Sequence, residues 1–244
     1  TQHRTIGGSH MKKTIGILGG MGPLATADLF QKIVSLTAAG SDNEHIRVYI
    51  DSNASIPDRT AAILNGGPDP LPAMRDSLRK LEACGADCVI MPCNTAHYFL
   101  PRLQGLTDIP FLSMVEAAAA ACRVRFPGGT AAVLATRGTL SAGLYQAALE
   151  KAGVSYLLPE EAERDALMDV IYNGVKAGAP PESYRVRFLS VLEALSGRGA
   201  DYFILGCTEL PLAFRLLGLS QPGLDPTEEL AKAAIRFCGY PLKG

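Results

Sequence analysis

The chain alternates between short runs of apolar, largely β-branched residues and longer stretches that carry an apolar residue at every third or fourth position. The short runs are typical of buried strands and fall at 14–18, 46–50, 88–91, 131–134, 154–158 and 202–205. The longer stretches predict amphipathic helices at 24–38, 144–152, 160–176 and 184–195, with a last helix near 228–237. Strands that alternate with helices predict parallel sheets covered by helices on both faces.

One stretch of the sequence occurs twice. Residues 85–93 (GADCVIMPC) match residues 199–207 (GADYFILGC), and a threonine follows shortly after the cysteine in both copies. A weaker similarity relates Leu29-Phe30-Gln31 to Leu144-Tyr145-Gln146. Gly-Ala-Asp before an apolar run is also a common helix-to-strand turn. The cysteine at the same distance from the glycine in each copy nevertheless favours an internal repeat.

The repeat predicts the organisation of the chain. We expect two similar doubly wound parallel-sheet α/β domains, related by a pseudo-twofold axis, with the active site in the cleft between them. The first domain is predicted at 11–116 plus 220–244, because the last helix returns to it, and the second at 117–219. Residues 1–10 (TQHRTIGGSH) are interpreted as a remnant of an expression tag and are left out of the fold prediction.

Composition narrows the class of protein. Apolar residues make up 48% of the chain, which is enough for two hydrophobic cores. The formal net charge of −1, without blocks of like charge, indicates neither a nucleic-acid nor a membrane partner. Six irregularly spaced cysteines do not resemble a disulfide framework, and no apolar run approaches the roughly 20 residues of a membrane span. We therefore expect a reduced, cytoplasmic protein.

Two cysteines are placed for chemistry. In parallel sheets the active site lies at the carboxyl ends of the strands, and Cys93 and Cys207 each follow a predicted strand and precede a helix. A helix N-terminus stabilises a thiolate, so the pKa of both thiols is expected to be lowered. The other cysteines are interpreted as small buried apolar residues, and no metal site is predicted: Cys84, Cys88, Cys122 and Cys238.

Other strand ends supply polar groups. The loop at 19–23 (GGMGP) follows a strand, but its Pro23 and the absence of a third correctly spaced glycine break the dinucleotide-binding pattern, so no cofactor is predicted. Such a turn can instead bring backbone donors close to a small anion. The strand ends give the predicted substrate-binding residues: Met21, Asn53, Asn94, Thr95, Thr136 and Thr208.

Several of these segments together resemble the aspartate/glutamate racemase family, and its aspartate racemase branch in particular. The matching motifs run in order along nearly the whole chain: 19–23 (GGMGP), 56–60 (IPDRT), 92–97 (PCNTAH), 134–139 (LATRGT), 171–178 (IYNGVKAG) and 205–210 (LGCTEL). The resemblance implies racemisation without pyridoxal phosphate. One cysteine thiolate removes the α-proton of a small acidic amino acid, and the other cysteine returns a proton to the opposite face.

The resemblance also implies roles for further residues. Arg59 and Lys176 are expected to bind the two substrate carboxylates, and a homodimer is expected. His97 and Glu209 follow the two cysteines closely and are candidates to orient the thiols. Aspartate is the expected substrate, with glutamate possible. Two alternatives stay open: a related isomerase or decarboxylase of a small dicarboxylate such as maleate or a malonate, and a protein that binds an acidic ligand without turnover.

Overall fold

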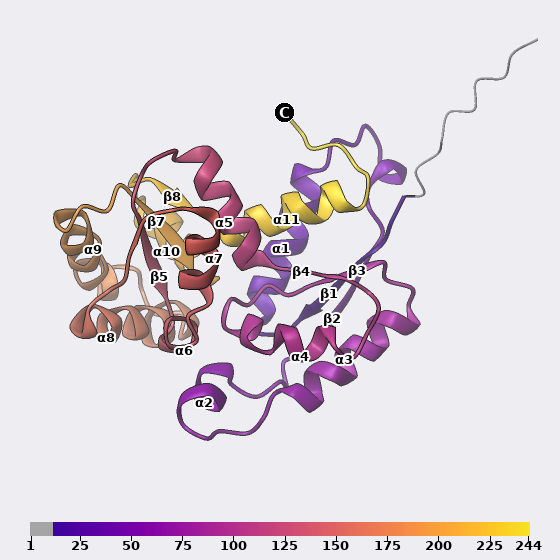
Figure 1. The fold of residues 1–244 in the computed structure, drawn as a ribbon, viewed down its shortest axis with the longest axis horizontal. Helices are drawn as coiled ribbons and strands as arrows, with labels where there is room; N and C mark the ends of the chain where they lie inside the picture. The colour runs from indigo at the N-terminus through magenta and orange to yellow at the C-terminus, as the bar shows by residue number, and fades with distance from the viewer. Residues whose placement is uncertain (1–11) are drawn as a thin grey trace, which may run out of the picture.

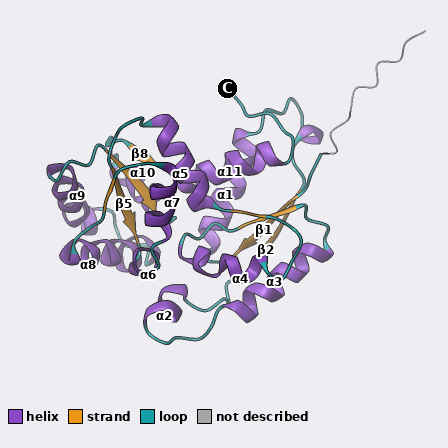
Figure 2. Ribbon diagram, in the orientation of Figure 1, coloured by secondary structure: helices purple, strands orange, loops and turns teal. Residues whose placement is uncertain are grey.

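The computed structural model describes residues 12–244, so the predicted tag remnant at 1–10 lies outside the described residues. The described chain forms two four-stranded parallel sheets with the orders β2-β1-β3-β4 and β6-β5-β7-β8. The two orders are identical when the second set of strands is renumbered from its own start. Helices cover the sheets on both sides (Figure 1; Figure 2). The predicted α/β fold with two similar parallel-sheet halves is confirmed.

The N-terminal half is built around a first strand whose five residues are all buried. Its strands are β1 (Ile15–Gly19), β2 (Val48–Ser52), β3 (Cys88–Ile90) and β4 (Phe111–Leu112). Its helices are α1 (Pro23–Leu36), α2 (Arg59–Leu64), α3 (Leu71–Ala83), α4 (Leu100–Gln104) and α5 (Met114–Arg125), with 3₁₀ turns η1 (Asp42–Glu44) and η2 (Thr95–Phe99).

The C-terminal half repeats this plan. Its strands are β5 (Ala131–Ala135), β6 (Tyr156–Leu157), β7 (Tyr202–Gly206) and β8 (Gly223–Leu224). Its helices are α6 (Arg137–Ser141), α7 (Leu144–Ala152), α8 (Glu161–Asp169), the π-helix η3 (Val170–Lys176), α9 (Glu182–Gly197) and α10 (Glu209–Leu217). The chain then ends on α11 (Pro226–Phe237).

The two halves share one continuous hydrophobic core. Ile15 and Ile17 of β1 belong to the same buried cluster as Val133 of β5 and Ile204 of β7. Helices α5 and α11 pack against each other inside this cluster, and α11 also contacts α1, β3, β4 and β7. Figure 1 shows α11 in yellow lying beside α1 and α5 between the halves. The boundaries at 116/117 and 219/220 remain predictions, because α11 contacts strands of both sheets.

The repeated Gly-Ala-Asp segment has the same structural role in both halves. Gly85 and Gly199 adopt left-handed φ angles of +84° and +99°, which favour glycine where each helix turns into the next strand. The following aspartates then join the third strand of each half to the first. The Asp87 carboxylate accepts a 2.7 Å hydrogen bond from the Thr14 backbone, and Asp201 accepts one of 2.7 Å from Thr130. The repeat therefore brings equivalent strand ends, including those that carry Cys93 and Cys207, to equivalent places.

The weaker predicted similarity is out of register by one residue. Along α1 the buried residues include Leu29 and Ile33, and along α7 they are Tyr145 and Leu149. Tyr145 is therefore the counterpart of Leu29, whereas the sequence match paired Leu29 with Leu144.

Candidate active site

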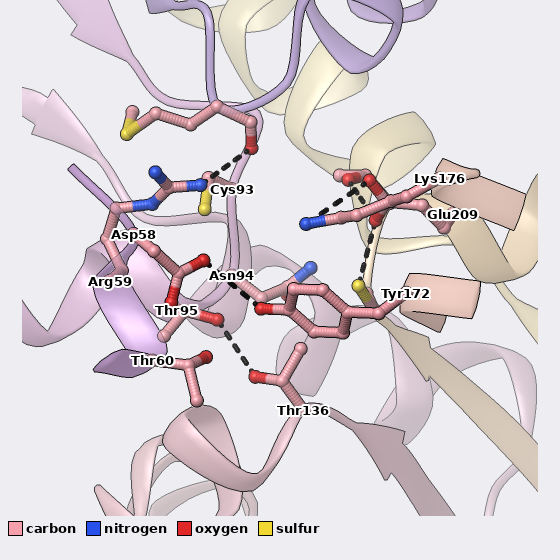
Figure 3. Close-up of a pocket in the computed structure, with 13 residues that line it drawn as sticks. Asp58, Arg59, Thr60, Cys93, Asn94, Thr95, Thr136, Tyr172, Lys176 and Glu209 are labelled. Carbon is pink, nitrogen blue, oxygen red and sulfur yellow. Dashed lines mark hydrogen bonds and ion pairs between the residues drawn. The ribbon is translucent and has the colours of Figure 1, made fainter. Parts of the chain in front are cut away.

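The carboxyl ends of the strands from both halves meet around one pocket (Figure 3). Its free space is about 20 Å³, enough for a water molecule and too small for an amino acid. Thirteen residues line it: Met21, Asp58, Arg59, Thr60, Cys93, Asn94, Thr95, Thr136, Tyr172, Lys176, Cys207, Thr208 and Glu209. Doubly wound sheets bind ligands where the strand order reverses, and the residues after β1, β3, β5 and β7 contribute to this lining.

Most of the predicted site residues lie in this pocket. Both predicted catalytic cysteines line it, as do Arg59 and Lys176 and the strand-end residues Met21, Asn94, Thr95, Thr136 and Thr208. Asn53 is outside the lining formed by the described residues. Its amide donates to the Ser77 hydroxyl at 3.1 Å and accepts from Ser55, so it organises the loop after β2.

The thiol of Cys207 contacts a carboxylate that is itself paired with an ammonium group. The thiol donates to Glu209 Oε2 at 2.9 Å, and Lys176 Nζ lies 3.9 Å from Glu209 Oε1. Burial raises the pKa of the Cys207 thiol well above its ordinary value, and the Glu209 carboxylate raises it further, while Lys176 opposes both. The expectation that the helix N-terminus lowers the pKa of Cys207 is therefore wrong. Desolvation and the adjacent negative charge outweigh the helix dipole.

A buried histidine, His97, holds the backbone of Cys93. His97 Nδ1 lies 2.9 Å from the Cys93 carbonyl oxygen, and the Met114 backbone donates to Nε2 at 3.1 Å. A ring that donates through one nitrogen and accepts through the other is neutral. Burial lowers the pKa of His97 to about 4. His97 thus fastens the Cys93 backbone to the start of α5, and it is not among the described residues that line the pocket.

Arg59 is a buried cation on the Cys93 side. Its guanidinium donates to the carbonyls of Pro57 at 2.9 Å and Ile56 at 3.2 Å, which fixes its orientation. Its Nε has no hydrogen-bond partner among the described residues. Burial alone would lower the pKa of Arg59, but the neighbouring Cys93 and Asp58 raise it overall, so the side chain stays charged. A rigid cation with a free donor is suited to an anionic ligand.

Lys176 is the matching cation on the Cys207 side, and it shares the π-helix η3 with Tyr172. Burial lowers the pKa of Lys176, but Glu209 and Cys207 raise it overall. Its ammonium lies 4.4 Å from the centre of the Tyr172 ring. Helix widening of this kind recurs at functional sites, and here both side chains reach the pocket from one short segment.

Tyr172 connects the two halves across the pocket. Its hydroxyl donates to Asp58 Oδ2 at 3.2 Å, and Asp58 also caps the start of α2 by accepting from the Ala61 backbone. Figure 3 draws this bond together with the Thr95–Thr136 bond among the residues that line the pocket. Sequence reasoning missed Asp58, Thr60 and Tyr172 as site residues. All three lie in motifs that were recognised, and the spacing of four between Tyr172 and Lys176 was the available signal.

The remaining cysteines are only partly as predicted. Cys88, Cys122 and Cys238 are fully buried, but Cys84 is exposed, because it caps the end of α3 at the surface. Within residues 12–244, no group of three or more His, Cys, Asp or Glu side chains is arranged to hold a metal ion. Of the helices in the same residues, none has the length and apolar composition needed to cross a membrane.

Comparison with known proteins identifies the family to which the chain belongs. The sequence model of the Asp/Glu/Hydantoin racemase family matches residues 18–234, nearly the whole described chain. The chain belongs to this racemase family. The expected family is therefore confirmed, and the matched range includes every residue that lines the pocket.

Individual racemases of the family match this chain over almost their full length. The chain is 30% identical to the aspartate racemase of Picrophilus torridus, with a TM-score of 0.82 over 95% of this racemase-family chain and 96% of that one. An aspartate racemase homologue from Pyrococcus horikoshii OT3 gives 25% identity and a TM-score of 0.73 over 93% and 99%. The broad specificity amino-acid racemase RacX of Bacillus subtilis (strain 168) is 26% identical over 91% of this chain and 96% of its own length.

Proposed function

We propose that this protein is an aspartate racemase that transfers protons between its two cysteine thiols and the α-carbon, without pyridoxal phosphate or a metal. One observation carries the proposal: Cys93 and Cys207 lie at equivalent strand ends of opposite halves and line the same pocket. Racemisation needs a base on one face of the α-carbon and an acid on the other. Two thiols contributed by related halves are suited to that arrangement.

The proton balance is symmetric between the two directions. One thiolate takes the α-proton, the opposite thiol gives its proton to the other face, and the two sulfurs end with exchanged protonation states. Burial and the adjacent Glu209 carboxylate raise the pKa of Cys207, which supports its starting as the acid for one enantiomer. For the other enantiomer Cys207 must begin as the base, and the Glu209 carboxylate 2.9 Å away is placed to accept its proton.

The charges of the pocket support a dicarboxylic substrate. Arg59, which is buried beside Cys93, and Lys176, which is partly exposed beside Cys207, provide one cation on each side. Two cations can each bind one carboxylate of aspartate, and a substrate with a neutral side chain would leave one of them without an anion. A buried charge without its partner is costly, so alanine should be rejected. Glutamate differs by one methylene group, which discriminates by about 1–3 kcal/mol at most.

The test is to measure kcat/KM for the D and L forms of aspartate, glutamate and alanine by chiral chromatography, in heavy water and without added pyridoxal phosphate. The proposal predicts turnover of aspartate, at least 100-fold slower turnover of alanine (about 2.7 kcal/mol), and deuterium at the α-carbon of the product. Turnover of alanine comparable to aspartate would contradict the anchoring roles of Arg59 and Lys176. RacX, whose name records broad specificity, makes that outcome a real alternative.

A different proton-transfer reaction of a small dicarboxylate is the second candidate. Maleate and malonate carry two carboxylates and fit the same pair of cations, so a substrate screen with these compounds distinguishes isomerase or decarboxylase activity from racemisation. Binding of aspartate without deuterium incorporation would indicate the third alternative, an acidic-ligand binding protein. The homodimer stays a prediction, which light scattering of the purified protein would test.

A further inference from the structure

Tyr145 of α7 is a fully buried residue that contacts both cysteine-bearing strand ends. Its hydroxyl donates to Asn94 Oδ1 at 2.6 Å, and Asn94 directly follows Cys93. Its ring lies against Gly206, which directly precedes Cys207: a Cβ added at Gly206 would lie 3.0 Å from Tyr145 Cε2. Tyr145 of the C-terminal half therefore packs against the residue that precedes Cys207 and also donates a hydrogen bond to the residue that follows Cys93.

The hydrogen bond orients the amide of Asn94. Since Oδ1 accepts from Tyr145, the amide nitrogen must point the other way. Nδ2 is buried and has no hydrogen-bond partner among the described residues, although Asn94 lines the pocket. Figure 3 shows the Asn94 nitrogen turned into the pocket. A buried donor without a partner is costly, and a pocket with two cations is one that an anion would occupy.

The hydroxyl is not needed to fill the core. The equivalent core position in the N-terminal half is Leu29, which is also fully buried and has no polar group. An apolar side chain therefore satisfies the packing at this position of the fold. Burial raises the pKa of Tyr145 well above its ordinary value, so the hydroxyl keeps its proton and stays a donor throughout the pH range of interest.

We propose that Tyr145 is a positioning residue, whose hydroxyl fixes the Asn94 amide so that Nδ2 donates to a substrate carboxylate oxygen. When the α-proton leaves, negative charge spreads onto that carboxylate, and a donor already oriented toward it stabilises the charge without reorganisation. Tyr145 acts through Asn94, because it is not itself among the described residues that line the pocket. This inference rests on the proposed racemase function.

The test compares Tyr145→Phe with a matched control. Tyr145→Phe keeps the ring against Gly206 and removes only the hydroxyl. Tyr202→Phe also removes a fully buried hydroxyl of the same half, one that has no hydrogen-bond partner among the described residues. We expect Tyr145→Phe to lower kcat about tenfold for both enantiomers of aspartate, with KM changed less than about threefold, because the bond matters most when charge develops. Tyr202→Phe should retain kcat.

A double-mutant cycle separates positioning from a general structural effect. In an Asn94→Ala background, Tyr145→Phe should cause no further loss of kcat, because the residue through which it acts is gone. Equal losses in both backgrounds would overturn the inference, as would a Tyr145→Phe variant within twofold of the wild type. Thermal unfolding of all variants shows whether each is folded. If the wild type itself does not racemise aspartate, the proposed function fails; if it does and Tyr145→Phe matches it, only this inference fails.

Discussion

Cys207 is a buried thiol whose pKa is raised by burial and by the adjacent Glu209 carboxylate. Its position at a strand end before a helix was readable from the sequence, because the cysteine recurs at a fixed distance in both halves. Its protonation was not readable, because the sequence predicts the helix dipole but not the depth of burial. Nor does it reveal that the Glu209 side chain turns back to accept from the thiol. Arg59 and Lys176, by contrast, were predicted only through the family resemblance.

Replacing Glu209 by glutamine should lower the pKa of Cys207. Burial still raises the pKa after this substitution, but the negative charge that also disfavours the thiolate is removed, and Lys176, which favours the thiolate, no longer pairs with a carboxylate at position 209. The measurement is the pH dependence of iodoacetamide labelling of the peptide that contains Cys207, followed by mass spectrometry. Its midpoint should move to lower pH than in the wild type.

Glu182→Gln is the matched control for this experiment, because Glu182 is exposed on α9 and pairs only with Arg185 in the described chain. Its labelling midpoint should equal that of the wild type. A midpoint that stays unchanged in Glu209→Gln, or that moves upward, would show that the carboxylate does not govern the Cys207 proton.

At the scale of elements, periodicity predicted most of the strands and several of the helices, but it did not find every segment. Helix α7 begins and ends where predicted. The predicted helix at 160–176 is divided into α8 and η3, because the last turns widen into a π-helix that no hydrophobic pattern signals. Strands β4 and β8 have two residues each, too few for any alternation to be visible. Helix α3 was also not predicted, and β2 begins two residues later than predicted.

His97, which lies in the 3₁₀ turn η2, should make the stability of the protein depend on pH. Burial lowers the His97 pKa in the folded protein from 6.5 to about 4, so between these values only the unfolded chain binds the proton. The contribution to the free energy of unfolding is fully present above pH 6.5 and is lost as the pH falls toward 4. Its size is at most about 3 kcal/mol.

Urea denaturation of the wild type and His97→Gln at pH 7, 5.5 and 4.5 measures this effect. Glutamine cannot titrate, so the difference in the free energy of unfolding between the two proteins should shrink as the pH falls. His45→Gln serves as the control, because His45 is only half-buried and is not among the described residues that line the pocket. If the free energies of unfolding of the wild type and His97→Gln changed in parallel with pH, His97 would not be a neutral buried side chain that resists protonation in the folded protein.

At the scale of the whole molecule, the pocket between the halves is narrow. Its free space of about 20 Å³ is less than aspartate needs, so we expect this to be the closed arrangement of the halves and expect them to move apart when substrate enters. The bond between Tyr172 and Asp58 spans the halves and must break or shift in that movement. Nothing in the sequence pattern reports the width of a cleft between two halves, which is set by contacts between segments more than 100 residues apart.

Tyr172→Phe should weaken the closed state without removing the ring that packs beside Lys176. A hydrogen bond of this kind contributes about 0.5–1.5 kcal/mol, so kcat/KM for aspartate should fall roughly two- to tenfold, mainly through a higher KM. Steady-state kinetics on both enantiomers checks this. Tyr156→Phe is the control, since its hydroxyl bonds Glu150 at the surface away from the pocket. An unchanged KM in Tyr172→Phe would show that the hydrogen bond between Tyr172 and Asp58 does not stabilise the closed arrangement.

The central claim, two thiols acting on opposite faces of one α-carbon, is tested most directly by the single variants Cys93→Ala and Cys207→Ala in heavy water. Neither should racemise aspartate, but each should incorporate α-deuterium into one enantiomer, and the two variants should differ in which one. Cys84→Ala, which changes an exposed cysteine, should behave like the wild type. Racemisation by either single variant at a rate near that of the wild type, or exchange of the same enantiomer by both, would contradict the two-thiol account.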